Sequence, residues 1–177
     1  MSFISNEYIS LRAIEPEDIE LIYSWENDSN IWHLGNTIIP FSKETIKKFI
    51  FESANNLFID CQLRLMIDLN ETNQTIGSID LYDFDAINMK AGVGVILNSE
   101  FRNNGYALKA LKLLIDYCFN ILNLKQLYCH IAVNNEKSIK LFEKADFQQS
   151  GKLKDWIKKQ GKREDVFIFQ LINQSIL

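Results

Sequence analysis

The sequence predicts a mixed α/β domain built around one central sheet. Segments with strand and helix periodicity follow one another in the order β-α-α-β-β-β-α-β-α-β-β. In the second half, a strand, a long helix and another strand come in succession, and such a unit makes its two strands parallel. The length of 177 residues is typical of one domain, so residues 1–177 are interpreted as a single unit.

The first half of the chain is predicted to form a strand, two helices and a hairpin. Pro16 stands where the first turn of a helix tolerates proline, and Ser42 is a suitable N-cap for the second helix. Polar residues at 70–73 supply the turn of the hairpin. The predicted elements are the strand 8–14, the helices 16–26 and 42–54, and the hairpin strands 62–68 and 75–83.

The second half is predicted to contain two parallel strands, a helix after each of them, and a C-terminal hairpin. Gly92 and Gly94 lie inside the first of these strands, where glycine often marks backbone that another group approaches closely. Ligands of such sheets bind outside the carboxyl ends of the parallel strands, so we expect the site there. The predicted elements are the strands 91–97 and 126–133, the helices 105–122 and 136–145, and the hairpin strands 147–158 and 163–171.

Composition excludes several classes of protein. The net charge of −4 argues against a dedicated nucleic-acid binder, which needs clustered Lys and Arg. No apolar stretch approaches the ~20 residues that span a bilayer, and residues 1–7 do not resemble a signal peptide. Cys61, Cys118 and Cys129 are far apart and are expected to be reduced packing residues, and no cluster has metal-ligand spacing. These features predict a cytoplasmic protein with no metal site and no membrane association.

The loop after strand 91–97 has the features of a phosphate-binding cradle. It leads into a helix N-terminus, where unpaired backbone N–H groups and the helix dipole favour an anion. Gly105 lets the backbone approach phosphate oxygens, and Asn103 and Asn104 are the non-glycine residues that most readily adopt left-handed conformations. A polar loop that merely caps a buried helix is the alternative interpretation.

A second polar stretch, residues 134–147, follows the next strand. Its Asn135 is a suitable N-cap for the following helix, and a ligand contact is compatible with that role. Residues 102–107 resemble the Arg/Gln-x-x-Gly-x-Gly/Ala signature of the GNAT superfamily of N-acetyltransferases. Residues 135–147 resemble its Asn-x-x-Ser/Ala-Ile-x-Leu-Tyr/Phe-x-Lys-x-Gly-Phe element, with Asp146 in place of the usual glycine. The resemblance covers nearly the whole chain and is greatest to spermidine/diamine and ribosomal-protein N-terminal acetyltransferases.

The resemblance implies a fold, a cofactor and a set of binding residues. The sheet should be mostly antiparallel with helices on both faces, and strands 91–97 and 126–133 should be parallel and splayed. Acetyl-coenzyme A should be the acetyl donor, and a primary amine should receive the acetyl group directly in a ternary complex. The implied cofactor-binding residues are Val95, Leu97, Arg102, Asn103, Asn104, Gly105, Tyr106, Ala107, Asn135 and Ser138.

The catalytic proton transfers are left open by the sequence. Candidate bases are Asp83 and Asp85, on the turn before strand 91–97, and Glu26, although each is alternatively a solvated surface carboxylate. Related polyamine acetyltransferases carry a tyrosine at the position of Phe142 and a glutamate at that of Gly92. Both departures argue against a polyamine-type mechanism that uses those side chains.

Other polar and aromatic residues have two interpretations. His130 lies on a strand face, where histidine is usually structural. Trp25, Trp32 and Phe41 are candidates for the wall of an acceptor pocket, with core packing as the alternative. The acceptor is expected to be a small molecule or a peptide N-terminus, and the protein a monomer or a homodimer. A non-catalytic acyl-coenzyme A sensor is the alternative from another functional class.

Overall fold

A computed structural model describes residues 4–28, 39–52, 56–159 and 161–175 of the chain. Within these residues one sheet has eight strands in the order β1-β2-β3-β4-β5-β6-β8-β7. The β5–β6 pair is parallel, and the other neighbouring pairs are antiparallel. The strands are β1 (Ile4–Ser5), β2 (Ile9–Ala13), β3 (Leu63–Leu69), β4 (Thr75–Asp85), β5 (Lys90–Leu97), β6 (Gln126–Ala132), β7 (Gln148–Lys159) and β8 (Lys162–Ile172).

The predicted order of elements is confirmed, with small changes of boundary. The described helices are α1 (Ile19–Glu26), α2 (Lys43–Glu52), α3 (Leu57–Asp60), α4 (Tyr106–Asn120) and α5 (Glu136–Glu143). Two of the elements, β1 and α3, were not predicted. They have two and four residues, which is too short for a hydrophobic period to appear in the sequence. Because β1 comes first, the parallel strands are the fifth and sixth in chain order rather than the fourth and fifth.

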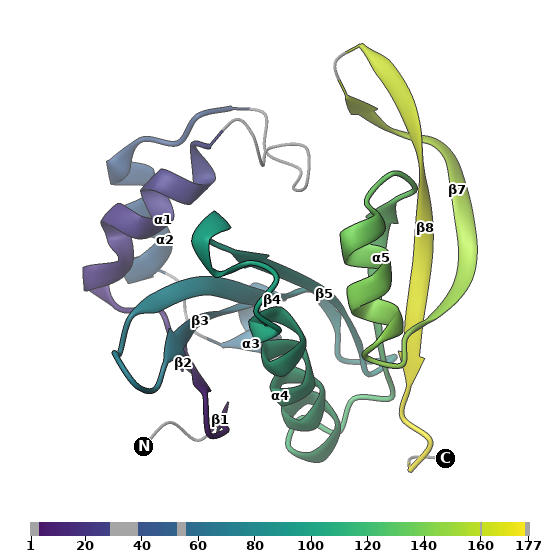
Figure 1. Cartoon of the computed structure of the whole chain (residues 1–177), viewed down its shortest axis with the longest axis horizontal. Helices are drawn as coiled ribbons and strands as arrows, with labels where there is room; N and C mark the ends of the chain where they lie inside the picture. The colour runs from purple at the N-terminus through teal and green to yellow at the C-terminus, as the bar shows by residue number, and fades with distance from the viewer. Residues whose placement is uncertain (1–3, 29–38, 53–55, 160, 176–177) are drawn as a thin grey trace.

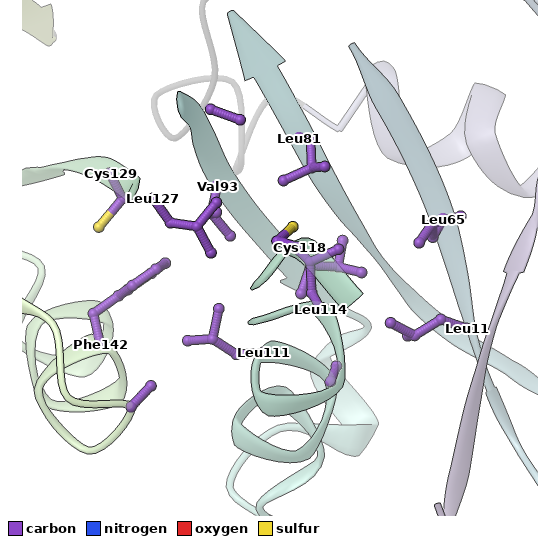
Figure 2. Close-up of a cluster of buried hydrophobic side chains, with 14 of the residues drawn as sticks. Leu11, Leu65, Leu81, Val93, Leu111, Leu114, Cys118, Leu127, Cys129 and Phe142 are labelled. Atoms are coloured by element: carbon purple, nitrogen blue, oxygen red, sulfur yellow. The ribbon is translucent and has the colours of Figure 1, made fainter. Parts of the chain in front are cut away.

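Helices cover both faces of the sheet, as expected. Leu111 and Leu114 of α4 and Phe142 of α5 belong to the larger buried cluster, which fills the α4–α5 face. Figure 2 shows the α4 side chains pointing toward the sheet and Phe142 directed toward Leu127 and Cys129. A smaller cluster joins α1 and α2 to the opposite side of β3 and consists of Ile22, Ile46, Ile50 and Met66. We call this side the α1–α2 face. Figure 1 shows α4 and α5 side by side, with the β7–β8 hairpin extending past α5.

An ion-pair network attaches the start of α1 to the sheet. The guanidinium of Arg12 on β2 donates to both oxygens of Asp18, at 2.6 and 2.8 Å, and to Asp68 at 2.6 Å. Burial alone raises the pKa of Asp18. Hydrogen bonds from Arg12 and from the Glu15 backbone N–H outweigh burial, and the net pKa lies below the ordinary value. The carboxylate is therefore ionised, and the network fixes where α1 leaves β2.

Polar side chains form hydrogen bonds at the end of α1 and at the start of α2. The Ser42 hydroxyl accepts a hydrogen bond from the Thr45 N–H at 3.1 Å, as expected of an N-cap of α2. Asn27 ends α1, and its side chain accepts from the Phe41 N–H at 2.9 Å and donates to the Tyr23 carbonyl at 2.9 Å. This asparagine therefore links the end of α1 to the segment that enters α2.

Two of the three cysteines are packing residues. Cys118 and Cys129 are buried, and burial raises the pKa of the Cys118 thiol to about 12. The expectation of burial was wrong for Cys61, which is exposed. It ends the short α3 in a left-handed conformation, with φ 53°, at a surface turn that the apolar neighbours in the sequence did not reveal.

Within the described residues, no helix combines the length and apolar character that crossing a bilayer requires. In the same residues, no three His, Cys, Asp or Glu side chains are grouped so as to hold a metal ion.

Candidate functional site

The site is organised by the point at which β5 and β6 separate. The parallel ladder has three residue pairs, from Lys90 with Gln126 to Gly92 with Tyr128, and pairing stops there. Ala91 and Gly92 are buried, whereas Gly94 to Ile96 are partly exposed, as expected for a strand that has lost its neighbour. We call the diverging segments, 93–97 of β5 and 129–132 of β6, the fork. The predicted splay of these two strands is therefore confirmed.

A large cavity of about 1160 Å³ opens at the fork. Its wall is formed by the end of β5, the loop that leads into α4, the first turn of α4, and the start and one side of α5. Nine of the ten residues predicted to bind the cofactor lie on this wall, and Asn104 is the exception. The nine are Val95, Leu97, Arg102, Asn103, Gly105, Tyr106, Ala107, Asn135 and Ser138. Residues from two separate sequence motifs thus face one space.

The loop before α4 has the conformation expected of an anion-binding cradle. Asn103 and Gly105 both have positive φ, 65° and 78°. The expected left-handed conformation is therefore confirmed for Asn103 but not for Asn104, whose φ is not positive. The Arg102 Nε donates to the Leu97 carbonyl at 2.9 Å and so closes the loop onto the end of β5. A Cβ atom at Gly105 would find its nearest neighbour, the Lys109 Nζ, 3.8 Å away. The backbone at Gly105 therefore stays open to an approaching group.

The start of α5 faces the same cavity. Asn135 is its N-cap, and its side-chain oxygen accepts a hydrogen bond from the Ser138 N–H at 3.2 Å. The N-terminal ends of α4 and α5 therefore both carry partial positive charge at this wall. Three lysines at helical spacing, Lys137, Lys140 and Lys144, also line the cavity. Sequence reasoning missed them, although their i, i+3, i+7 spacing after a predicted N-cap indicates one face of a helix.

This wall fits a cofactor with phosphate groups and an extended arm. Two helix N-termini, a loop with two left-handed residues and three cations supply the donors and charge that phosphates require. The gap between the diverging strands is bordered by the unpaired backbone edge of β5, so it suits a linear chain that bonds peptide groups. We therefore find the donor set consistent with coenzyme A.

The α1–α2 face carries a second, small cavity of about 120 Å³. Arg64 lies on its wall and donates to Glu26 at 2.5 Å and to Asp80 at 2.8 Å. Burial lowers the pKa of the Arg64 guanidinium, but the charges and hydrogen bonds of the two carboxylates outweigh it, and the net pKa is raised. Two carboxylates thus share one cation, and the group has one net negative charge. Phe49 and Tyr82 supply aromatic wall.

The structure does not bring the three candidate bases together. Glu26 pairs with Arg64, as described above. The Asp85 carboxylate accepts from the backbone N–H groups of Ile87 and Asn88, at 3.0 and 2.9 Å, in the β4–β5 turn at the end of β5 remote from the cradle. Hydrogen bonds from Asn88 hold the pKa of Asp85 below its ordinary value. Asp83 is exposed, with φ 49°, at a register shift in β4.

The aromatic candidates and His130 lie in different environments. The Trp25 Nε1 donates to the Asn98 Oδ1 at 2.5 Å, and both side chains lie on the large cavity. Phe41 packs against the small cluster on the α1–α2 face, and Trp32 lies outside the described residues. His130 is exposed, with its ring edge-on to Tyr128 at 5.6 Å. No buried structural role is therefore visible for this histidine.

Phe142 lies in the core rather than on the large cavity. Its side chain is 4% exposed, and its ring packs edge-on against Phe147 with 5.0 Å between the ring centroids. A residue without a hydroxyl at this position can be packed completely among apolar neighbours. The chain therefore has no proton donor at the place where related polyamine acetyltransferases carry their tyrosine.

Comparisons with known proteins agree with this geometry. The family model for the acetyltransferase (GNAT) domain matches residues 9–148. An uncharacterized N-acetyltransferase p20 of Bacillus licheniformis is 30% identical over 99% of this chain and 98% of its own. A spermidine N(1)-acetyltransferase of Vibrio cholerae is 29% identical over 97% of both chains.

A solved structure shows the same fold with a cofactor present. The spermidine N-acetyltransferase of Vibrio cholerae in complex with CoA and spermine has a TM-score of 0.81 and 27% identity, covering 94% of this chain and 96% of the other. The residues that form the fork and the cradle lie inside the matched region or next to it. The chain therefore belongs to the GNAT family of acetyltransferases and is an N-acetyltransferase that uses acetyl-coenzyme A.

Proposed function

We propose that the protein transfers the acetyl group of acetyl-coenzyme A directly to a primary amine while both substrates are bound. The observation that carries this proposal is that the large cavity borders the fork, while the small cavity is lined by Tyr82, whose strand partner Gly92 stands at the closed end of the fork. The large cavity borders the fork and the cradle, and the small one lies on the α1–α2 face of the neighbouring strands. Two substrates that reach one gap from different sides need no covalent enzyme intermediate.

The cysteines also argue for direct transfer. Cys118 and Cys129 are buried, and burial raises both thiol pKa values, so neither is a thiolate at neutral pH. Cys61 is exposed at the end of α3 and does not line either cavity. An acyl-cysteine intermediate therefore has no suitable nucleophile on the wall of the site.

We assign the cofactor-binding roles to the chain's own groups as follows. The first turns of α4 and α5 hold phosphate through backbone N–H groups, and Lys137, Lys140 and Lys144 add charge. Backbone groups of Val95 and Leu97, freed where β5 leaves β6, hold the extended arm. The bound cofactor supplies an activated acetyl thioester at the closed end of the fork. Asn135 caps the start of α5 at the cavity wall.

The amine must lose a proton before it attacks, because an alkylammonium has a pKa of ~10. Of the three candidate bases, we favour Asp83, acting through water. Asp85 is engaged in capping the β4–β5 turn, and Glu26 is engaged with Arg64. Burial raises the pKa of Tyr128, and the charges of Asp83 and then Asp85 raise it further, so both carboxylates lie near this tyrosine, and of the two it is Asp85 that the turn engages.

The acceptor is proposed to be a small amine. The Vibrio cholerae relative is named for spermidine, and its solved complex contains spermine. In this chain Arg64 already neutralises one of the two carboxylate charges on the small cavity. A long polycation therefore finds less negative charge there than two free carboxylates would offer, and an acceptor with a single amine is favoured.

The test is release of free coenzyme A thiol from acetyl-coenzyme A with a panel of acceptors. The panel contains monoamines, diamines, spermidine, an aminoglycoside and peptides with free N-termini. We expect turnover with a small monoamine and less with spermidine or peptides. Cofactor binding by calorimetry without turnover on any acceptor would favour the acyl-coenzyme A sensor, for which the buried Phe142 is the specific observation. Absence of cofactor binding would overturn the proposal.

A further inference from the structure

Three residues on neighbouring strands form a row across the closed end of the fork. Tyr82 of β4 is paired with Gly92 of β5, and Gly92 is paired with Tyr128 of β6. The second of these is the last pair before β5 and β6 diverge. Because Leu81 belongs to the core of the α4–α5 face, the next side chain, Tyr82, lies on the α1–α2 face.

The ring of Tyr82 occupies the place of a side chain at position 92. A Cβ atom built on Gly92 would lie 2.2 Å from the Tyr82 Cε2 and 2.4 Å from its Cζ. Gly94, two residues further on the same side of the strand, has no heavy atom within 4 Å of such a Cβ. The two glycines therefore differ: Gly94 leaves open space, whereas a side chain at Gly92 would displace the ring of Tyr82.

The hydroxyl of Tyr82 reaches the third strand. The backbone N–H of His130, two residues beyond the last paired residue of β6, lies close enough to this hydroxyl to lower its pKa against the larger effect of burial. The ring also packs edge-on against Tyr128, with the centroids 5.9 Å apart. Tyr82 therefore crosses β5 and links β4 to β6 at the position where the two parallel strands stop pairing.

The hydrogen of this hydroxyl is not used by the described part of the chain. A phenol accepts and donates at the same time, and among the described residues no hydrogen bond is donated by the Tyr82 hydroxyl. Burial is the largest influence on Tyr82 and raises its pKa well above the ordinary value, so the phenol is protonated at neutral pH. A neutral donor thus stands at the closed end of the fork.

We propose that Tyr82 is a catalytic hydrogen-bond donor whose hydroxyl contacts the acetyl thioester at the closed end of the fork, and that position 92 is glycine to admit its ring. The inference rests on the proposed function, because it needs the cofactor arm to lie in the fork. One side chain, Tyr82, then accounts for both positions at which this chain differs from the related polyamine enzymes, Phe142 and Gly92. The donor that Phe142 lacks comes from β4, and the space that a side chain at 92 would need is taken by the same tyrosine.

The first test compares Tyr82→Phe with Tyr117→Phe, a tyrosine on α4 that lines neither cavity. We expect Tyr82→Phe to lower kcat by about 10²-fold, while KM for the amine and Kd for acetyl-coenzyme A change less than about threefold. The second readout is the ¹³C chemical shift of carbonyl-labelled acetyl-coenzyme A bound to each protein. Tyr82→Phe should move this resonance, and Tyr117→Phe should not.

The second test measures the coupling between the two positions without any ligand. Gly92→Ala is made in the wild type and in Tyr82→Ala, and thermal unfolding midpoints are compared. We expect Gly92→Ala to lower the midpoint by about 5 °C in the wild type and by much less when the ring is absent. Equal effects in both backgrounds would show that the ring does not require the glycine, and would overturn that half of the proposal.

The outcomes separate this inference from the proposed function. If the wild type neither binds acetyl-coenzyme A nor releases its thiol, the proposed function fails. If the wild type does both, and Tyr82→Phe matches it in kcat and in the ¹³C shift, Tyr82 is not a donor to the thioester. A loss of kcat with an unchanged ¹³C shift would also contradict direct contact.

Discussion

The two sides of the fork are built from different chemical groups, backbone on one side and side chains on the other. The cofactor side is mainly backbone, since it uses two helix starts, two left-handed residues and the freed edge of β5. Most of it comes from one continuous stretch, residues 95–108. The α1–α2 face is built from side chains of four separate elements, with Glu26, Phe49, Arg64 and Tyr82 among them. The difference indicates that donor recognition is carried by local chain conformation, and acceptor recognition by tertiary packing.

The largest expected effect comes from the cradle. Gly105→Glu adds a carboxylate and a Cβ at φ 78° where phosphate should bind, so acetyl-coenzyme A affinity should fall by more than about 100-fold. Calorimetry measures the affinity. Gly161→Glu is the matched control, because Gly161 also has positive φ, 82°, and is exposed in the β7–β8 turn away from the cavity. Equal loss of affinity in both variants would mean that backbone strain, and not the cradle, is responsible.

The next effect belongs to the α1–α2 face. Arg64→Met leaves Glu26 and Asp80 without their cation, and we expect stability to fall by about 2 kcal/mol, because partly buried carboxylates lose their partner. Urea unfolding measures the loss. The affinity for acetyl-coenzyme A should stay within about twofold of the wild type, because the ion triad does not touch the cradle. A parallel loss of affinity would contradict the separation of the two sides.

A compensating variant checks the origin of that loss. Adding Glu26→Gln and Asp80→Asn to Arg64→Met removes the two uncompensated charges. Most of the lost stability should then return. If it does not, the packing of Arg64 against Phe49, with the guanidinium 5.9 Å from the ring centroid, is the larger contribution.

A pH-dependent effect is expected at the network that fixes α1. The folded pKa of Asp18 is lowered, so the folded state binds its proton at lower pH than the unfolded chain does. The contribution of Asp18 is fully present above its ordinary pKa of ~4 and is lost as pH falls through the lower folded value. Asp18→Asn should therefore cost about 2 kcal/mol at neutral pH and less in acid. Urea midpoints from pH ~7 to ~3 measure this, and a constant difference would refute it.

The smallest effect is expected at the three lysines on and directly after α5. Changing Lys137, Lys140 and Lys144 to Gln together should weaken acetyl-coenzyme A binding by about fivefold at low salt. The difference should shrink at high salt, because exposed charges are screened. The control with the same change of net charge replaces exposed lysines outside the cavity, Lys47, Lys48 and Lys112. If the control weakens binding as much, only the overall charge matters.

The parts of the molecule that the sequence predicted are those governed by local rules. Alternation and helical spacing located the main strands and helices, and Ser42 and Asn135 were recognisable as caps. The left-handed Asn103 followed from the tolerance of asparagine for that conformation. These features depend on residues that are neighbours along the chain, and for that reason one sequence was sufficient.

Features that depend on register between strands could not be predicted. The sequence indicated that some group approaches Gly92, but only the pairing of β4 with β5 identifies that group as Tyr82. Asp85 looked available in the sequence, whereas its carboxylate is used by the turn that it begins. Arg64 is 38 residues away from Glu26 in the sequence, so the ion pair between them had no local signal.

The short β5–β6 ladder also determines the mechanical continuity of the sheet. Strands β1 to β5 and strands β6 to β8 are joined, as a hydrogen-bonded ladder, by three residue pairs. Such a seam opens at lower free energy than the long ladders on either side of it, and the two parts are suited to move as separate cooperative units. A linear ligand held in the gap would bond both edges and act as an additional strand across the seam. Ligand binding would then raise the cohesion of the whole domain, in addition to filling a cavity.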